Sequence, residues 1–217
     1  AFSQEFGKGA GEVADIHLEK HLPHQAGLGG GSSDAAAALV GAAKLWGIDP
    51  CDARIESVAK SLGADVAFFL RGGCALYNGA GENYVRSLKP RKDPVVLIKP
   101  EGGLSTAAVY KAFDKKPIFA DEYLKNRLAT AHAAEDVPLF NGLEDTADRL
   151  DNTLGSIRSW ALSQPGVLNA MLTGSGSCTF VICANTQTAL TVSAAAQAQG
   201  WWATSTFFTN IRAAISR

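Results

Sequence analysis

Residues 26–38 read AGLGGGSSDAAAA, a tract that places four glycines directly before two serines, an aspartate and a run of alanines. Glycine has no Cβ, so several consecutive backbone N–H groups can face one concavity without obstruction. The alanines predict a helix, whose first N–H groups and positive dipole end would point to the same place. The tract therefore predicts a phosphate cradle, to which the hydroxyls of Ser32 and Ser33 can add contacts with phosphate or with a bound Mg²⁺ ion.

Two common nucleotide-binding loops do not fit this tract. A dinucleotide-binding loop reads Gly-x-Gly-x-x-Gly, and a count that starts at Gly27 and Gly29 has Ser32 in the last position. After the helix that follows the tract, the next predicted element is another helix, in place of the strand that should carry a ribose-binding acid. A P-loop ends in Gly-Lys-Ser/Thr, and no lysine follows these glycines. A different nucleotide-binding loop and a structural turn remain as readings.

Three further stretches hold candidate site residues. Asp65 precedes an apolar run in LGADVAFF, where a lone carboxylate is either a site residue or a solvated group of a loop or helix end. The turn Thr173–Ser177, TGSGS, lies between two predicted strands, and taken alone it also suits a plain hairpin with glycines at positive φ. Thr106 and Tyr110 lie four apart on a predicted helix and share one face, which as a bare pair favours core packing.

The elements around the glycine tract are a strand and a helix. Residues 16–20 alternate apolar and polar side chains, as a half-buried strand does. Residues 24–31 form the loop, and Ser32 or Ser33 is the expected N-cap of the helix. That helix is expected to stop near Gly47.

Short elements fill the rest of the N-terminal part. A helix after Pro50 should bury one face, made of Ile55, Val58, Ala59 and Leu62. Residues 61–73 pass from this helix into a buried apolar run. Residues 74–88 read as two short strands around a glycine-rich turn.

The C-terminal part predicts a sheet with helices. Residues 94–100, PVVLIKP, form a continuous apolar strand between prolines, which is typical of the centre of a sheet. Further expected elements, in chain order, are helices at about 105–113, 120–134 and 143–163, a strand–turn–strand over 166–185, a helix over 186–200 and a strand over 201–210. This mixture of hairpins and helices indicates an α+β fold rather than regular βαβ alternation.

Composition narrows the class of protein. The chain has 217 residues and a net charge of −1, which gives no reason to expect nucleic acid or an anionic membrane as a partner. No stretch resembles a transmembrane segment or a secretory signal. We expect Cys51, Cys74, Cys178 and Cys183 to be reduced, buried small hydrophobes of a cytoplasmic protein.

Four ordered stretches carry a family resemblance. LPHQAGLGGGSSDAAAAL resembles the signature P-x-x-x-G-L-G-G-G-S-S-D/N-A of the GHMP kinases. The triple glycine before Ser-Ser-Asp is similar to one branch, the 4-diphosphocytidyl-2-C-methyl-D-erythritol kinases. SLGADVAFFLRGGCALYNGAGE, STAAVYKAF and MLTGSGSCTF match the same branch in the same order. The resemblance covers roughly residues 16–217 and is much more specific than any single motif.

The resemblance implies a fold and its division. The GHMP kinase fold has two domains, an N-terminal part like domain 2 of ribosomal protein S5 and a ferredoxin-like C-terminal part. We expect an ATP-binding domain over 1–90 and a C-terminal domain over 91–217. The family's N-terminal segment, with a lysine and an asparagine on the first strand and a Gly-Tyr-His stretch, has no counterpart before Ile16. We therefore expect a fragment that is poorly soluble and catalytically weak by itself.

The resemblance also implies residue roles. ATP, with Mg²⁺ whose ligands the sequence does not identify, would contact Pro23, Gly27, Leu28, Gly29, Gly30, Gly31, Ser32, Ser33, Gly174, Ser175 and Gly176. Asp65 corresponds to the family's general base at the acceptor hydroxyl. Thr106 and Tyr110 correspond to positions that line the cytidine pocket, and the turn Thr173–Ser177 to the third family motif, which packs against the first loop.

Two residues depart from the branch. Ala67 stands where the family usually has proline, which loosens the local backbone and leaves the Asp65 carboxylate in place. Asn141 heads Asn-Gly-Leu-Glu where the branch tends to read Asn-Asp-Leu-Glu, and with Gly142 departing we assign no site role there.

The function implied is transfer of the ATP γ-phosphate to the 2-hydroxyl of 4-diphosphocytidyl-2-C-methyl-D-erythritol. The expected partner is this small-molecule substrate, with no nucleic acid or membrane, and the protein would be a monomer or homodimer. Two alternatives remain open. One is a GHMP kinase with another small alcohol or sugar as acceptor, and the other is a non-catalytic nucleotide-binding protein.

Overall fold

The computed structural model describes residues 1–7 and 14–213, which form two compact units. The helical unit comprises the described residues of Ala1–Leu22, Gly29–Leu88 and Asn210–Arg217. The sheet unit comprises Pro23–Leu28 and Lys89–Thr209. Leu28 and Gly29, neighbours in the glycine tract, therefore belong to different units.

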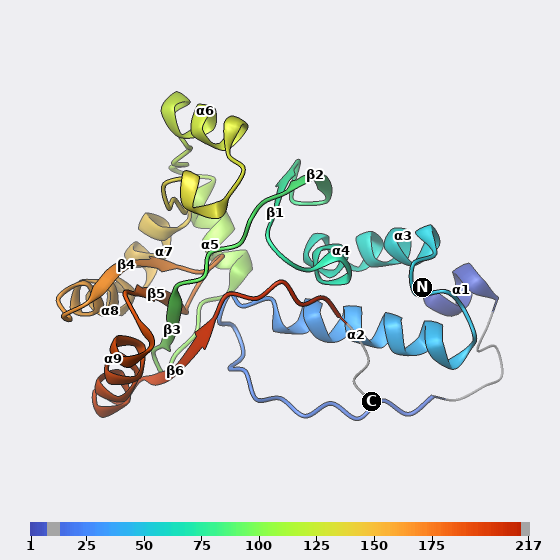
Figure 1. Cartoon of the computed structure of the whole chain (residues 1–217), viewed down its shortest axis with the longest axis horizontal. Coiled ribbons are helices and arrows are strands. Elements are labelled where there is room, and N and C mark those ends of the chain that lie inside the picture. Colours follow the sequence, from blue (N-terminus) through green and yellow to red (C-terminus); the bar gives the residue numbers. More distant parts are fainter. Residues whose placement is uncertain (8–13, 214–217) are drawn as a thin grey trace. The chain divides into compact units, whose positions relative to one another are not determined.

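The helical unit packs helices around a core rich in alanine. Its elements are α1 (Phe2–Phe6), α2 (Gly30–Leu45), α3 (Ala53–Leu62), α4 (Ala64–Arg71) and the antiparallel hairpin of β1 (Ala75–Asn78) and β2 (Asn83–Ser87) (Figure 1). Buried side chains of α2, α3 and α4 form one cluster, among them Leu39, Ile55 and Val66. The small alanines of α2 allow the other two helices to approach closely.

The helix after the glycine tract begins earlier than predicted. Its N-cap is Gly29 in the left-handed region, at φ +66°, and no side chain caps it. The predicted caps Ser32 and Ser33 lie inside its first turn. The expectation was wrong because glycine adopts the left-handed conformation at little cost, so the backbone can turn at Gly29 and enter the helix at once. The C-terminal end agrees with the prediction, since α2 ends at Leu45 and Gly47 follows at φ +66°.

Residues 16–20 do not form the predicted strand. They are extended but pair with no strand among the described residues, and Ile16 is 74% exposed. The alternating pattern specifies a face for burial but cannot supply a neighbouring strand, and a strand is stable only when its backbone groups are paired.

Two further details of the helical unit differ from the sequence expectations. Ile55, Val58 and Ala59 of α3 are buried as predicted, but Leu62 at the end of that helix is 50% exposed. The apolar run after Asp65 is helix α4, in which Val66 and Ala67 are buried. An apolar run of this length suits a buried strand or a helix equally well. The two short strands around a glycine-rich turn are confirmed by the β1–β2 hairpin.

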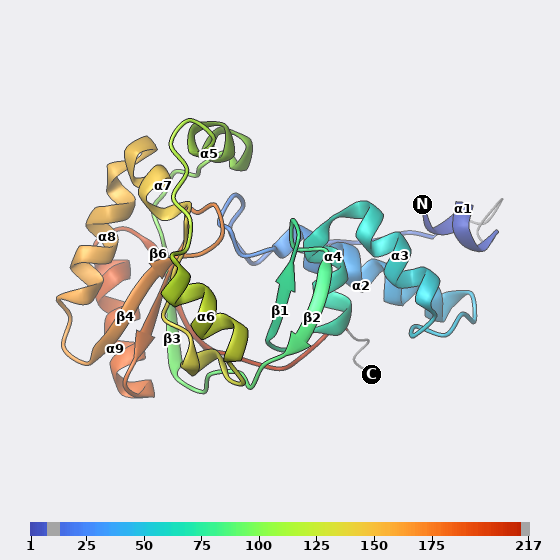
Figure 2. The same ribbon diagram turned by 90° about the horizontal axis from the view of Figure 1, so that it is seen from above.

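The sheet unit is built on an antiparallel sheet of order β4-β5-β3-β6. The strands are β3 (Pro94–Lys99), β4 (Val167–Leu172), β5 (Thr179–Cys183) and β6 (Trp202–Phe207). The helices are α5 (Thr106–Phe113), α6 (Glu122–Thr130), α7 (Glu144–Leu150), α8 (Asn152–Leu162) and α9 (Thr186–Ala198), with a short 3₁₀ turn, η1 (Ala134–Asp136). Figure 2 shows this unit with its helices α5 to α9. The continuous apolar run of β3 is central, as predicted, and pairs with β5 and β6.

The core of the sheet unit lies between the sheet and the pair α8 and α9. Val96 and Ile98 of β3 and Val181 of β5 pack against Ile157 of α8 and Val192 of α9, and all five are buried. Small residues of α9 let it lie close to the sheet. This layer of two helices on an antiparallel sheet confirms the α+β class.

Two predicted helices are shorter than expected. The helix expected over 143–163 is two helices, because Asp151 adopts an extended conformation and its side chain accepts a hydrogen bond from the backbone N–H of Thr153. Asp151 is thus the N-cap of α8 and ends α7. The helix expected over 120–134 is confined to Glu122–Thr130 and starts at the N-cap Asp121.

The cysteines and the hydropathy add two observations. All four cysteines are free thiols. Cys178 and Cys183 are buried as expected, whereas Cys74 is only partly buried and Cys51 is exposed, contrary to expectation. Cys51 lies in the turn before α3, outside the apolar periodicity that buries side chains. In the part of the chain that the structure describes, no helix is long and apolar enough to cross a membrane.

Candidate active site

The N-terminus of α2 carries the second half of the glycine tract. The first backbone bond of the helix joins the N–H of Ser33 to the carbonyl of Gly29 at 2.9 Å. The N–H groups of Gly30, Gly31 and Ser32 precede it, and a helix leaves such leading donors without partners of its own. With no side chain at the N-cap to occupy them, these groups and the positive dipole end suit a phosphate group.

Close packing at Gly29 places α4 beside this N-terminus. A Cβ at Gly29 would lie 2.9 Å from the ring of Phe69, so no larger residue fits without displacing the ring. Asp65 lies one helical turn before Phe69, in the first turn of α4, and is exposed. The structure thus brings the predicted carboxylate into the same unit as Gly29–Ser33, with solvent access to its side chain.

An ion pair neutralises the acidic residue of the tract. The Lys20 ammonium contacts the Asp34 carboxylate, and both side chains are about one-third exposed or less. An unpaired Asp34 would repel phosphate at the start of α2. Lys20 is exposed as a residue, and through this ion pair it supports the electrostatics of the tract.

In the sheet unit, the first half of the tract packs on the turn Thr173–Ser177. The N–H groups of Ser177 and Cys178 donate to the carbonyls of Gln25 and Ala26, each at 3.1 Å. The Thr173 hydroxyl donates to the carbonyl of Gly27. Gly27 has φ +70°, and a Cβ there would lie 2.1 Å from the Thr173 carbonyl oxygen. Gly27 is therefore required for this contact, in addition to any role with a ligand.

The predicted pair on α5 is exposed rather than packed in the core. Tyr110 is 52% exposed, and Val109 is the buried residue of this helix. Thr106 points to the turn, where its hydroxyl lies 2.9 Å from that of Ser175. The structure thus brings Thr106 and Ser175 together, and the ring of Tyr110 is available for contact one helical turn away.

Asn141 contacts the same turn, which sequence reasoning missed. Its amide nitrogen donates to the carbonyls of Leu172 and Gly174 at 2.9 and 2.8 Å. The next residue, Gly142, is explained by sterics, since a Cβ there would lie 2.6 Å from the carbonyl oxygen of Ile118. The departure from the branch pattern at Gly142 thus accompanies a close backbone approach.

The thiol of Cys178, the residue after the turn, is unreactive at neutral pH. Cys178 is fully buried, and burial raises the pKa of its thiol to about 12. At neutral pH the group is therefore protonated and a poor nucleophile.

The remaining predicted residues flank these contacts along the chain. Pro23 and Leu28 lie in the segment Pro23–Leu28 of the sheet unit. Gly174 and Gly176 have φ +53° and +87°, so both require glycine's conformational freedom within the turn.

Comparison with known proteins identifies the family. The profile of the GHMP kinases N terminal domain matches residues 1–73, and that of the GHMP kinases C terminal matches residues 121–200. The chain belongs to the GHMP kinase family. The GHMP kinases are ATP-dependent phosphotransferases, and their two profiles match in the order that the family resemblance predicts.

Individual relatives agree with this assignment. The 4-diphosphocytidyl-2-C-methyl-D-erythritol kinase of Desulfitobacterium hafniense is 39% identical over 180 residues, which cover 81% of this chain and 62% of the relative. The enzyme of the same name from Deinococcus radiodurans is 38% identical over 207 residues, 90% of this chain and 67% of the relative. The chain spans a little under two-thirds of the length of the relative from D. hafniense.

Solved structures share the fold of this GHMP kinase. A crystal structure of 4-(cytidine 5'-diphospho)-2C-methyl-D-erythritol kinase has a TM-score of 0.76 and 31% identity, with coverage of 95% of this chain and 75% of the other. A homoserine kinase from Cytophaga hutchinsonii has a TM-score of 0.65 at 18% identity, with coverage of 89% and 69%, which shows the common fold alone.

The N-terminus of α2 fits a phosphate group of ATP, because its leading N–H groups have no side-chain cap. Magnesium in kinases is held largely by phosphate oxygens and water, with one or two protein ligands. Among the described residues, no three His, Cys, Asp or Glu side chains gather into a protein metal site. In the helical unit, Ser32, Ser33 and Asp65 offer oxygen atoms that suit a metal arriving with the nucleotide, whereas the Asp34 carboxylate is paired with Lys20.

Proposed function

We propose that this protein transfers the γ-phosphate of ATP to the 2-hydroxyl of 4-diphosphocytidyl-2-C-methyl-D-erythritol, within the non-mevalonate route to isoprenoid precursors. The relatives that carry this name, at 38–39% identity, support the acceptor. The observation that carries the chemistry is the glycine tract, whose first half is bonded to the turn Thr173–Ser177 and whose second half starts α2.

In this proposal the backbone of the tract holds the phosphates. The N–H groups of Gly30–Ser32 and of the turn residues Gly174 and Ser175 bind phosphate oxygens. The N–H of Gly176 donates to the Thr173 carbonyl and fixes the turn, and Pro23, Gly27 and Leu28 shape the approach. Mg²⁺, bound with the nucleotide, would neutralise phosphate charge. Phosphoryl transfer depends mainly on such positioning and charge neutralisation.

Asp65 acts as the general base in the proposed reaction. Its exposed carboxylate on α4 accepts the proton of the acceptor hydroxyl as that oxygen attacks the γ-phosphorus. Thr106 and Tyr110 contact the cytidine part of the acceptor from α5, with the aromatic ring stacked near the base. We further propose that the ATP-binding domain covers residues 1–90 and the C-terminal domain residues 91–217.

The test, made in the full-length natural polypeptide, is a comparison of wild type with Asp65→Asn in turnover and in nucleotide binding. We expect the variant to lose about 10²–10⁴-fold in kcat and to keep its affinity for ATP, because the amide cannot accept the proton. Asp49→Asn, which alters an exposed carboxylate before α3, is the matched control and should keep full activity.

The same assay separates the alternatives. A kinase for another acceptor would phosphorylate homoserine or a plain sugar alcohol in place of the cytidine-containing acceptor. A non-catalytic binder would bind ATP with no turnover in wild type. Either outcome would reject the proposed substrate.

A further inference from the structure

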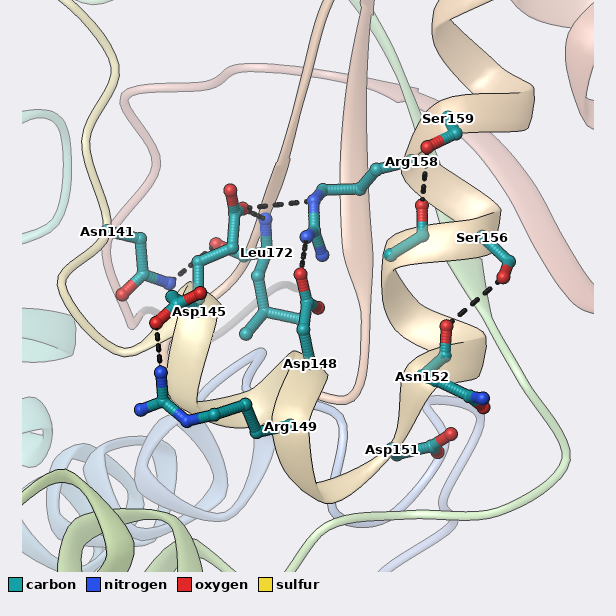
Figure 3. Close-up of polar contacts among 12 residues, drawn as sticks. Asn141, Asp145, Asp148, Arg149, Asp151, Asn152, Ser156, Arg158, Ser159 and Leu172 are labelled. Atoms are coloured by element: carbon teal, nitrogen blue, oxygen red, sulfur yellow. Dashed lines mark hydrogen bonds and ion pairs between the residues drawn. The ribbon is translucent and has the colours of Figure 1, made fainter. Parts of the chain in front are cut away.

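The Asn141 side chain bonds to the residues on both sides of Thr173, the first residue of the turn Thr173–Ser177. Asn141 donates through its amide nitrogen to the carbonyl of Leu172 at 2.9 Å (Figure 3). The same nitrogen donates to the carbonyl of Gly174 at 2.8 Å. Its amide oxygen accepts the backbone N–H of Leu143 at 3.0 Å. Both donor hydrogens and the acceptor are in use, so the orientation of the amide is defined on both sides.

Leu172, the residue before the turn, is fixed a second time. The Glu144 carboxylate accepts its backbone N–H at 2.7 Å. The same carboxylate oxygen lies 3.4 Å from Nε of Arg158, whose guanidinium also pairs with Asp148. Arg158 is 8% exposed and Leu172 is fully buried, so the residues that support the start of the turn are rigidly held.

The turn also contacts predicted ligand-binding residues. The Thr173 hydroxyl donates to Gly27, and the Ser175 hydroxyl pairs with that of Thr106 at 2.9 Å. The backbone of Gly174–Gly176 therefore lies between the rigidly held Leu172 and the first half of the glycine tract. Because Asn141 holds the carbonyl of Gly174 itself, its amide determines where the following N–H groups point.

We propose that Asn141 is a positioning residue for nucleotide binding, which holds the turn Thr173–Ser177 in the conformation that binds phosphate. This inference rests on the proposed function for the role of the turn. It explains why the position needs an asparagine. Aspartate has the same shape but no donor, so it would place an anion against two carbonyl oxygens. Serine offers one donor on a shorter arm.

The experiment measures binding of the magnesium complex of the non-hydrolysable analogue AMP-PNP by calorimetry. We expect Asn141→Asp to weaken binding by about tenfold or more and Asn141→Ser by about threefold, since they remove two and one of the amide's bonds to the turn. Asn126→Asp, which makes the same chemical change on exposed α6, should bind as wild type does.

A second readout separates positioning from general structural loss. Binding of CDP, which reports the proposed cytidine pocket, should change less than twofold in Asn141→Asp, and the melting temperature of each variant shows that it folds. If Asn141→Asp does not fold, Asn141→Ser decides the question. Unchanged AMP-PNP affinity in the folded Asn141 variants, or equal loss of AMP-PNP and CDP binding, overturns the inference.

Failure of the proposed function would look different. Wild type would then bind AMP-PNP but leave 4-diphosphocytidyl-2-C-methyl-D-erythritol unphosphorylated. The ranking of Asn141, serine and aspartate in AMP-PNP affinity would still be measurable, because that assay needs no acceptor.

Discussion

Replacement of Gly27 by alanine tests the packing of the glycine tract on the turn Thr173–Ser177. Gly27 has φ +70°, and its added Cβ would lie 2.1 Å from the Thr173 carbonyl oxygen and 3.1 Å from the backbone nitrogen of Gly176. Backbone atoms line both contacts, so no side chain can rotate away. The segment must therefore move away from the turn.

The magnitude follows from the contacts that this movement breaks. An L-residue in the left-handed region costs about 1–2 kcal/mol. Loss of the hydrogen bonds from Thr173 to Gly27 and from Cys178 to Ala26 costs about 0.5–1.5 kcal/mol each. The free energy of unfolding should therefore fall by about 2–5 kcal/mol, which corresponds to a melting temperature lower by roughly 5–20 °C.

The assay is urea denaturation, with AMP-PNP affinity measured on the folded fraction. Gly41→Ala is the control, because Gly41 lies inside α2 and its added Cβ would meet nothing within 4 Å. The free energy of unfolding of that control should rise by up to about 1 kcal/mol, since alanine favours a helix. A free energy of unfolding for Gly27→Ala within about 0.5 kcal/mol of wild type would refute the packing argument.

Three other perturbations test the sheet unit. Asp151→Ala removes the N-cap of α8 and should lower the free energy of unfolding by about 1 kcal/mol in denaturant titration, whereas Asp151→Ser should retain most of it. Arg158→Met leaves Glu144 and Asp148 without their shared cation and should lower the free energy of unfolding by about 3–5 kcal/mol at pH 7. A smaller loss at pH 3 than at pH 7 in denaturant titration would confirm that the charges are responsible. Two backbone N–H groups and Arg127 lower the pKa of the Asp136 carboxyl, so its contribution to stability is present above pH 4 and is lost as the pH falls through the lowered pKa. A carbon-13 titration that places this pKa at or above its ordinary value would contradict that contact.

Elements with a long periodic pattern were predictable, because such an element requires only that neighbouring elements cover its apolar face. The strand over Pro94–Lys99 and the helix over Thr186–Ala198 are of this kind. The strand over 16–20 was not predictable in the same way, since it depends on a partner strand. The early start of α2 depends on one backbone conformation at Gly29, which any glycine can adopt and none must.

The site was predictable only as far as its residues form contiguous motifs. The glycine tract and the turn Thr173–Ser177 are recognisable as short sequence patterns. Asn141 bonds to backbone groups 31 and 33 residues away, and a side-chain bond to a distant carbonyl leaves no pattern in the sequence. Asp151 likewise ends a helix by capping the next one, although the helical periodicity continues through it.

The hydrogen bond from Thr173 to Gly27 joins residues 146 positions apart. On a ribosome that adds roughly 5–20 residues per second, the segment with Gln25, Ala26 and Gly27 waits on the order of 10 s for its partner to be synthesised. During that interval it is open to proteases and chaperones. A nascent chain stalled before residue 173 should therefore be cut in this segment, and release of the completed polypeptide should protect it.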